Sequence, residues 1–126
     1  MKLEQWWEKA KAGERNALVA RRVMSIPTEL IHHQPAGKEI TYGGITCRVA
    51  AVADYQGSIP DAWDVVEKMR AGGWFLQIKG PADSRWAGAA QFTRDAAGPL
   101  SVWTLGRSVQ EATCLAALKA VGVEEV

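Results

Sequence analysis

Hydrophobic and polar residues follow a helical period between Ser58 and Gly73 and a strand period directly afterwards. The apolar positions that recur on one helical face are Ile59, Ala62, Trp63, Val66 and Met69, and the positions facing water are Asp64, Glu67, Lys68 and Arg70. Ser58 suits the N-cap of this helix, and Pro60 suits its first turn. Gly72 or Gly73 suits a C-terminal cap in the left-handed backbone conformation. Residues 74–79 alternate with period two. We therefore expect Trp63 and Trp74 to fill a core between this helix and a sheet.

Two further helical regions lie near the ends of the chain. The first 24 residues are rich in helix formers, but Gly13 interrupts them, which predicts either one bent helix or a short helix followed by a second from Glu14. Ser108 and Glu111 form an S-x-x-E capping box. The small residues of the helix that follows, Ala112, Ala116, Ala117 and Ala120, suit close packing.

The remaining patterns predict strands. Residues 38–42 and 45–52 flank Gly43-Gly44, a pair that suits a two-residue hairpin turn. Residues 74–79, 86–94 and 100–105 read as three strands of a meander, separated by turns at 80–83 and 95–99, with the alanine-rich second strand in the centre. This order predicts an α+β fold in which helices pack on a mainly antiparallel sheet, in two or three layers.

Several stretches resemble one known family. These are residues 54–69, Gly73-Trp74, residues 108–121 and, for the opening of the family pattern, residues 12–24. They are similar to the phage ABA sandwich domain family and cover about half of the chain in the expected order. The resemblance implies an α-β-α sandwich and a phage or prophage origin, and it brings no catalytic motif. Residues 31–53 depart from the pattern as an inserted β-hairpin, where the function of this member could reside.

Composition narrows the class of protein. A chain of 126 residues suits a single domain, here with residues 1–13 as an N-terminal helical extension. An apolar fraction of 48% and a net charge of +1 argue against a disordered tail and against a general nucleic-acid binder. No apolar run is long enough for a membrane span or a signal peptide, so we expect a protein in the cytoplasm of an infected bacterial host. Cys47 and Cys114 fit free thiols.

Catalytic chemistry has little support in the sequence. There is no phosphate-binding loop, dinucleotide fingerprint, H-E-x-x-H or C-x-x-C motif, so we expect no enzyme, no cofactor and no metal site. His32 and His33 are adjacent, and neighbouring side chains of a strand point to opposite faces. They read either as surface histidines or as a ligand or acid–base pair in an irregular backbone.

Tryptophans beside arginines suggest a different kind of site. Trp86 follows Arg85, and Trp103 precedes Arg107 by four residues, an arrangement that can grip a base and a phosphate, or can simply be a core indole next to a solvated arginine. Basic residues outnumber acidic ones between positions 70 and 107, and two helix N-termini offer free amides. The predicted ligand-binding residues are Tyr55, Gln56, Ser58, Arg85, Trp86, Arg94, Trp103, Arg107 and Ser108, and the alternative site comprises His32, His33, Tyr42 and Arg48.

Three functions remain open from the sequence. The first is a phage-encoded binding protein that sequesters an anionic nucleotide immune signal, of the cyclic nucleotide or cyclic ADP-ribose type, as an anti-defence protein. The alternative is a module that binds a host or phage protein through the aromatic N-terminal helix or the hairpin, and the third is a small phosphodiesterase-like enzyme using His32 or His33. Trp6 and Trp7 cannot both be centred on one narrow helical face, so we also expect a homo-oligomer that uses them.

Overall fold

The computed structural model describes residues 1–26, 39–42, 44–48, 53–79, 88–94 and 103–126 of the protein. In chain order the elements are α1 (Leu3–Lys9), α2 (Ala12–Arg22), β1 (Glu39–Tyr42), β2 (Ile45–Arg48), α3 (Ile59–Ala71), β3 (Phe75–Lys79), β4 (Gly88–Thr93), β5 (Thr104–Gly106) and α4 (Val109–Ala120). This order confirms the predicted α+β class. Residues 80–83 and 95–99, where turns are predicted, lie outside the described residues.

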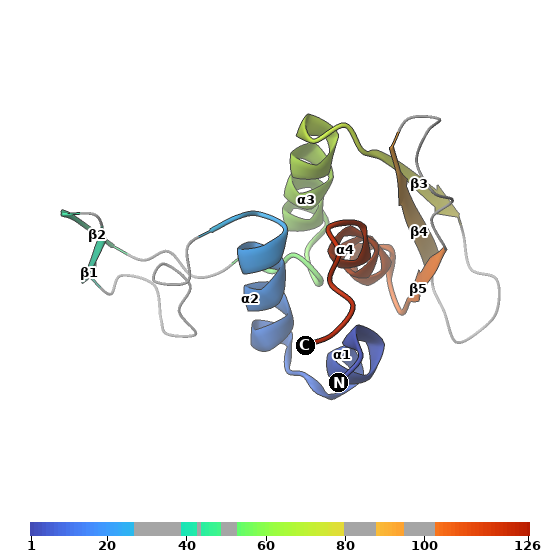
Figure 1. Ribbon diagram of the computed structural model, residues 1–126, viewed down its shortest axis with the longest axis horizontal. Helices are drawn as coiled ribbons and strands as arrows, with labels where there is room; N and C mark the ends of the chain where they lie inside the picture. Colours follow the sequence, from blue (N-terminus) through green and yellow to red (C-terminus); the bar gives the residue numbers. More distant parts are fainter. Residues whose placement is uncertain (27–38, 43, 49–52, 80–87, 95–102) are drawn as a thin grey trace.

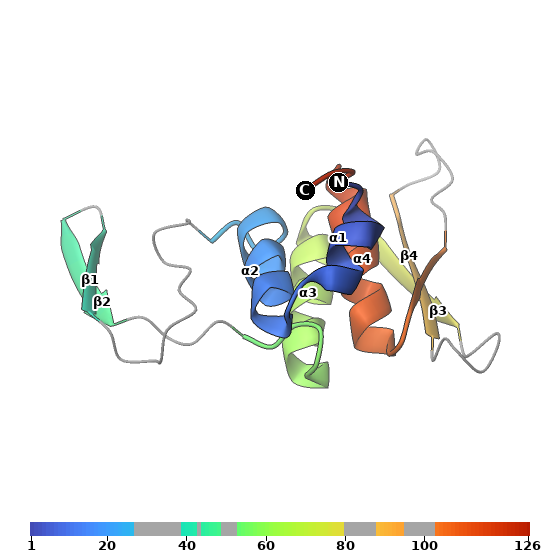
Figure 2. The same ribbon diagram turned by 90° about the horizontal axis from the view of Figure 1, so that it is seen from below.

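The meander forms a three-stranded antiparallel sheet in the order β3-β4-β5, so the alanine-rich strand is central as expected. The four described helices all lie on one side of this sheet (Figure 1), with α4 against β4 and β5 and α3 next to α4. The view from below shows the same arrangement (Figure 2). The described residues thus form a helical layer on an open sheet.

The sheet approaches α4 closely because it carries no side chain at two paired positions. Gly88 and Gly106 are opposite each other in β4 and β5. A Cβ atom on Gly106 would lie 2.5 Å from the backbone nitrogen of Ala112, and one on Gly88 would lie 2.9 Å from Cγ2 of Val109. The glycines and the small residues of α4 therefore set the spacing between the two layers, which confirms the role predicted for the alanines of α4.

The limits of α3 agree with the sequence pattern. Oγ of Ser58 accepts a hydrogen bond from the backbone N–H of Asp61 at 3.5 Å, and Gly73 ends the helix with a φ of +88°. The Asp61 carboxylate accepts from the backbone N–H of Asp54 at 3.0 Å, so it fastens the preceding loop. The hydrogen bond from the Trp74 N–H to the Met69 carbonyl, 3.0 Å long, completes the helix end.

The predicted orientation of α3 is wrong for its two largest apolar residues. Trp63 is 55% exposed and Ile59 is 69% exposed. The buried residues of the helix are Ala62, Val65, Val66 and Met69. Since each residue turns the helix by about 100°, including Val65 moves the centre of the buried face away from Trp63. Trp63 therefore does not fill the core, whereas Trp74 is partly buried against it.

Two separate helices form the N-terminal region. The first helix ends at Lys9, the second begins at Ala12, and Gly13 lies inside the first turn of the second. Although α1 lies in the stretch expected to be an extension, Leu3 and Trp7 are both 1% exposed and belong to the main core. The two ends of the chain are paired, because the N–H of Val126 donates to the Met1 carbonyl at 2.9 Å. The first helix is consequently an integral part of the fold.

The hairpin is also present. The two strands β1 and β2 pair antiparallel with Tyr42 opposite Ile45, and Gly44, which lies in the turn between them, has a φ of +81°. This two-stranded sheet stands apart from the helices and from the larger sheet (Figures 1 and 2). The rest of the predicted insertion, residues 31–38 and 49–52, lies outside the described residues.

Candidate functional site

The described residues among those predicted to bind a nucleotide come from separate elements of the fold. Those that the structure describes fall into three groups: the loop before α3, the end of the sheet near Trp74, and the region where β5 meets α4. Arg85 and Trp86, which are central to the prediction, lie outside the described residues, as do His32 and His33. The strand register places Tyr42 beside the hairpin turn and Arg48 at the open end, so the backbone positions of this alternative pair are separated along the hairpin.

The loop before α3 is occupied by contacts within the chain. Tyr55 is 5% exposed, and burial together with the nearby carboxylates of Asp64 and Asp61 raises the pKa of its hydroxyl. The backbone N–H of Gln56 donates to Oδ1 of Asn16 at 3.1 Å. Ser58 caps α3. Among the described residues this loop therefore serves to join α2 to α3.

One predicted cation, Arg94, and one further cation, Lys79, lie over tryptophan rings. The Arg94 guanidinium lies 4.5 Å from the centroid of the Trp74 ring, and Nζ of Lys79 lies 4.5 Å from that of Trp103. Both pairs join neighbouring or nearby strands. The described contacts thus pair Trp103 with Lys79 and Trp74 with Arg94, whereas the expected pair of Arg85 and Trp86 lies outside the described residues.

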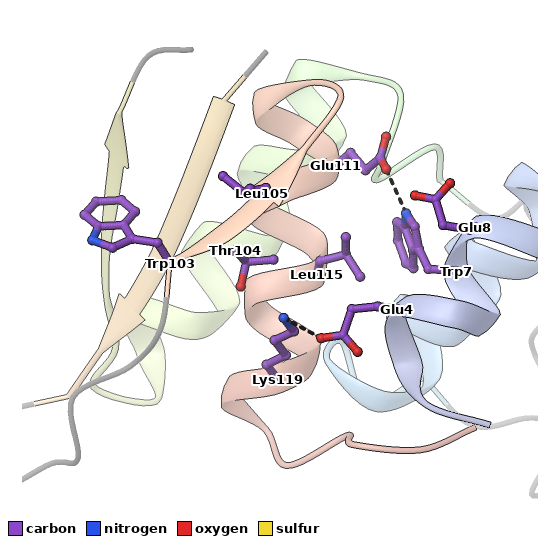
Figure 3. A pocket seen from close by; sticks show the side chains of 9 residues that line it. All are labelled: Glu4, Trp7, Glu8, Trp103, Thr104, Leu105, Glu111, Leu115 and Lys119. Carbon is purple, nitrogen blue, oxygen red and sulfur yellow. Dashed lines mark hydrogen bonds and ion pairs between the residues drawn. The ribbon is translucent and has the colours of Figure 1, made fainter. Parts of the chain in front are cut away.

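Arg107, in contrast, pairs with Glu8, which lines a cleft between α1, β5 and α4. This cleft has a volume of about 480 Å³. Its lining residues are Glu4, Trp7, Glu8, Trp103, Thr104, Leu105, Glu111, Leu115 and Lys119. We call it the α1 cleft. Figure 3 shows that the three glutamates and Trp7 approach from the helices, while Leu115 and Leu105 add apolar surface.

The charged residues of the α1 cleft have unequal partners. Oε1 of Glu4 is 2.7 Å from Nζ of Lys119, and this contact is the main reason why the pKa of Glu4 is lowered. Oε2 of Glu8 is 2.9 Å from Nη2 of Arg107. Glu111 is only 7% exposed, and its Oε1 accepts a hydrogen bond from Nε1–H of Trp7 at 3.0 Å (Figure 3). Within the described part of the chain, no cation lies within salt-bridge distance of the Glu111 carboxylate.

The side chain of Glu111 differs from its predicted role. Oγ of Ser108 accepts from the backbone N–H of Glu111 at 3.1 Å, as a capping box requires, but the Glu111 carboxylate accepts from the Trp7 indole rather than from the backbone N–H of Ser108. Sequence reasoning did not identify the acidic residues of this cleft. The spacing of Glu4 and Glu8, four residues apart on one helix, is the signal that was available.

A second surface is apolar and lies at the other edge of the sheet. Trp63, Phe75 and Ile78 are 55%, 59% and 47% exposed, respectively. Together with Val66, Arg70 and Leu76 they line a shallow groove of about 420 Å³. We call it the β3 groove. Exposed aromatic and aliphatic side chains that adjoin one another mark interaction surfaces more often than isolated ones do.

The tryptophans that were expected to form an oligomer contact are both packed within the chain. Trp7 is 1% exposed, and the Arg15 guanidinium lies 5.2 Å from its ring centroid. Trp6 is partly buried against the core. The indole of Trp7 is therefore inaccessible to a second copy, because α1 turns it toward α4.

Other chemistry is sparse in the described residues. No group of three histidine, cysteine, aspartate or glutamate side chains in the described ranges is placed to hold a metal ion. Cys114 is a free, buried thiol, and burial raises its pKa strongly. None of the helices described is long and apolar enough to cross a membrane.

Comparisons with known proteins identify the relatives of this fold. The phage ABA sandwich domain matches residues 17–118, and no curated protein matches the chain. A phage protein from Bacillus cereus has a similar crystal structure, with a TM-score of 0.60 and 17% sequence identity. The similarity covers 86% of this chain and 90% of that one. At this identity the structural match supports the fold alone, and the family match does not assign a biochemical activity. The chain belongs to the phage ABA sandwich domain family.

Proposed function

We propose that this protein is a non-enzymatic binding protein of a phage, acting in the cytoplasm of the infected bacterium, and that its α1 cleft takes a basic side chain of a protein partner. The observation that supports this proposal is the carboxylate of Glu111. It is buried beside an open cleft, it accepts one hydrogen bond from Trp7, and it has no cationic partner in the described residues.

The electrostatics of the α1 cleft favour a cation over an anion. Glu4 and Glu8 are each already paired with a cation, whereas Glu111 has no such partner among the residues that the structure describes. Removing a carboxylate from water is costly unless an opposite charge or further hydrogen bonds compensate it. An arginine or lysine head group beside Glu111 would supply both. The apolar surface of Leu105 and Leu115 suits the methylene stem of such a side chain.

A titration with small probes tests this proposal. We expect N-acetyl-arginine amide to shift the NMR signal of the Trp7 indole N–H, and its uncharged analogue N-acetyl-glutamine amide to leave it unchanged. Glu111→Gln keeps an oxygen that can accept the hydrogen bond from Trp7 but removes the charge. It should therefore weaken binding of the arginine probe at least about tenfold. Glu67→Gln, which removes an exposed carboxylate on α3, is the matched control and should have no effect. Equal responses to both probes, or unaltered binding by Glu111→Gln, would contradict the proposal.

An anionic nucleotide, of the cyclic nucleotide or cyclic ADP-ribose type, is a second candidate ligand, and its capture would make the protein an anti-defence protein. The supporting observation is the pair of cation–indole contacts on the sheet, Lys79 with Trp103 and Arg94 with Trp74. Aromatic faces beside cations can hold a base and a phosphate together.

The nucleotide candidate can be tested separately. We expect cyclic dinucleotides or cyclic ADP-ribose isomers, added to the whole protein, to raise its melting temperature and to shift the indole signals of Trp74 and Trp103. Arg94→Ala or Lys79→Ala should weaken such binding about tenfold to a hundredfold, since each removes one charge-assisted contact to phosphate. If no nucleotide binds at millimolar concentration, this candidate fails while the proposal for the α1 cleft stands.

A further inference from the structure

The strand β3 is an edge strand whose outer side pairs with no other described strand. The sheet order is β3-β4-β5, so only one side of β3 meets a neighbour. Edge strands are commonly protected by charged residues, prolines or bulges, because their free N–H and C=O groups can pair with another chain. The segment Phe75–Lys79 contains one charged residue, at its last position, and no proline.

Apolar surface continues from this edge onto α3. Phe75 and Ile78 are about half exposed, and so is Trp63 on the neighbouring helix. Adjoining exposed apolar side chains of this kind mark interaction surfaces more often than isolated ones do. A stable dimer buries roughly 800 Å² on each partner. A dimer through this surface therefore has to include the strand edge and its flanking residues as well as the β3 groove.

The sequence of β3 is complementary to itself when it is paired antiparallel about Gln77. In that register Gln77 lies opposite Gln77 of a second copy, Leu76 lies opposite Ile78, and Phe75 lies opposite Lys79. Apolar residues then meet on the face that carries α3, and the lysine of each copy meets a phenylalanine rather than another lysine. Like charges opposite each other would destabilise such a pair, and this register avoids them.

We propose that a second copy of this chain pairs with β3 through a two-fold axis at Gln77. The two sheets become one continuous sheet, and the α3 helices of both copies approach each other across the axis. The exposed indoles of Trp63 then pack between them and cover the β3 groove. This interface is distinct from the α1 cleft, so it does not depend on the proposed function, and it replaces the Trp6 and Trp7 surface as the site of self-association.

Light scattering of the whole protein, measured from low micromolar to near-millimolar concentration, tests the proposal. We expect a mass rising to twice the chain mass of 13.7 kDa. Ile78→Lys places a charge in the apolar interface and should raise the dissociation constant of the dimer at least about a hundredfold. Val121→Lys introduces the same charge at another exposed apolar position, 38% exposed, and should leave the dimer intact.

A second variant protects the test against loss of folding. Trp63→Gln changes an exposed helical position, so it should fold normally by circular dichroism and still weaken the dimer. Hydrogen exchange of the β3 amides should slow as the concentration of the unmodified protein rises, and Trp63→Gln should abolish this dependence. A chain that stays monomeric throughout, or a dimer that withstands both Ile78→Lys and Trp63→Gln, would overturn the proposal.

Discussion

The indole N–H of Trp7 donates a 3.0 Å hydrogen bond to the carboxylate of Glu111, a residue 104 positions later in the chain. The bond is buried, and it ties α1 to the first turn of α4. It also holds the carboxylate beside the α1 cleft. Helix attachment and the electrostatics of the proposed binding site thus depend on the same pair of side chains.

We expect Trp7→Phe to lower the free energy of unfolding by about 2 to 4 kcal/mol, because it leaves a buried acceptor without its donor and reduces the packed volume. Adding Glu111→Leu removes the unpaired acceptor, so the double variant should be more stable than the sum of the two single changes predicts, by about 1 to 3 kcal/mol. Urea unfolding of the four proteins measures this coupling. Additive effects would show that the hydrogen bond contributes little.

Gly106→Ala should destabilise the protein by about 1 to 3 kcal/mol, because the new methyl group would overlap the backbone of α4 at Ala112 and force the layers apart. Gly72→Ala is the matched control, since a Cβ atom there would lie 3.4 Å from its nearest neighbour and the backbone φ is −87°. Thermal unfolding of both variants gives the comparison. Equal losses would mean that the contact between sheet and α4 is more adaptable than its geometry indicates.

The buried thiol of Cys114 makes stability depend on alkaline pH. Burial raises its pKa far above the ordinary value of 9.0, so the folded protein keeps the proton while the unfolded chain loses it. The stability associated with this group is complete below about pH 9 and declines above it, by up to about 1.4 kcal/mol per pH unit. Cys114→Ala should lack this decline. The test is to measure the unfolding free energies of the parent and of Cys114→Ala between pH 8 and 10.5. Both proteins contain Cys47, so its contribution cancels in the comparison.

Trp63→Ala should cost less than about 1 kcal/mol when the protein is dilute enough to be monomeric, because the indole is more than half exposed there. Phe92→Ala, at a core position that is 1% exposed, should cost about 3 to 5 kcal/mol under the same conditions. Chemical unfolding at low micromolar concentration compares the two. A large loss for Trp63→Ala in the monomer would contradict the orientation of α3.

Local signals predicted the elements of this fold well. The caps of α3 and α4, the glycine that ends α3 and the Gly-Gly turn of the hairpin each depend on a few neighbouring residues, so the sequence displays them directly. The central position of β4 could be predicted because alanines and a glycine allow close approach on both sides. The orientation of α3 could not, because the apolar residues of this helix extend over more than half of its circumference and tertiary packing selects which of them are buried.

The candidate site was harder to predict for a related reason. Arg107 and Glu8 are 99 residues apart, and their 2.9 Å contact exists only because α1 packs beside α4. The sequence shows a free cation at Arg107, whereas the fold supplies it with a partner. Glu111 reads as a capping residue, and only the position of Trp7 reveals the other use of its carboxylate. Contacts between residues so far apart in the chain cannot be predicted from the residue spacing within a single segment.

The pairing of the two chain ends makes the backbone nearly a closed ring. The N–H of Leu3 donates to the carbonyl of Glu124 at 3.0 Å, and Val126 and Met1 are joined in the same way. A linker of a few residues could connect these ends, and the chain could be opened instead at the turn beside Gly44, whose hairpin forms a sheet separate from the larger one. In such a circular permutant α4 would lead directly into α1, and the Trp7–Glu111 bond would join helices that are neighbours in sequence as well as in space.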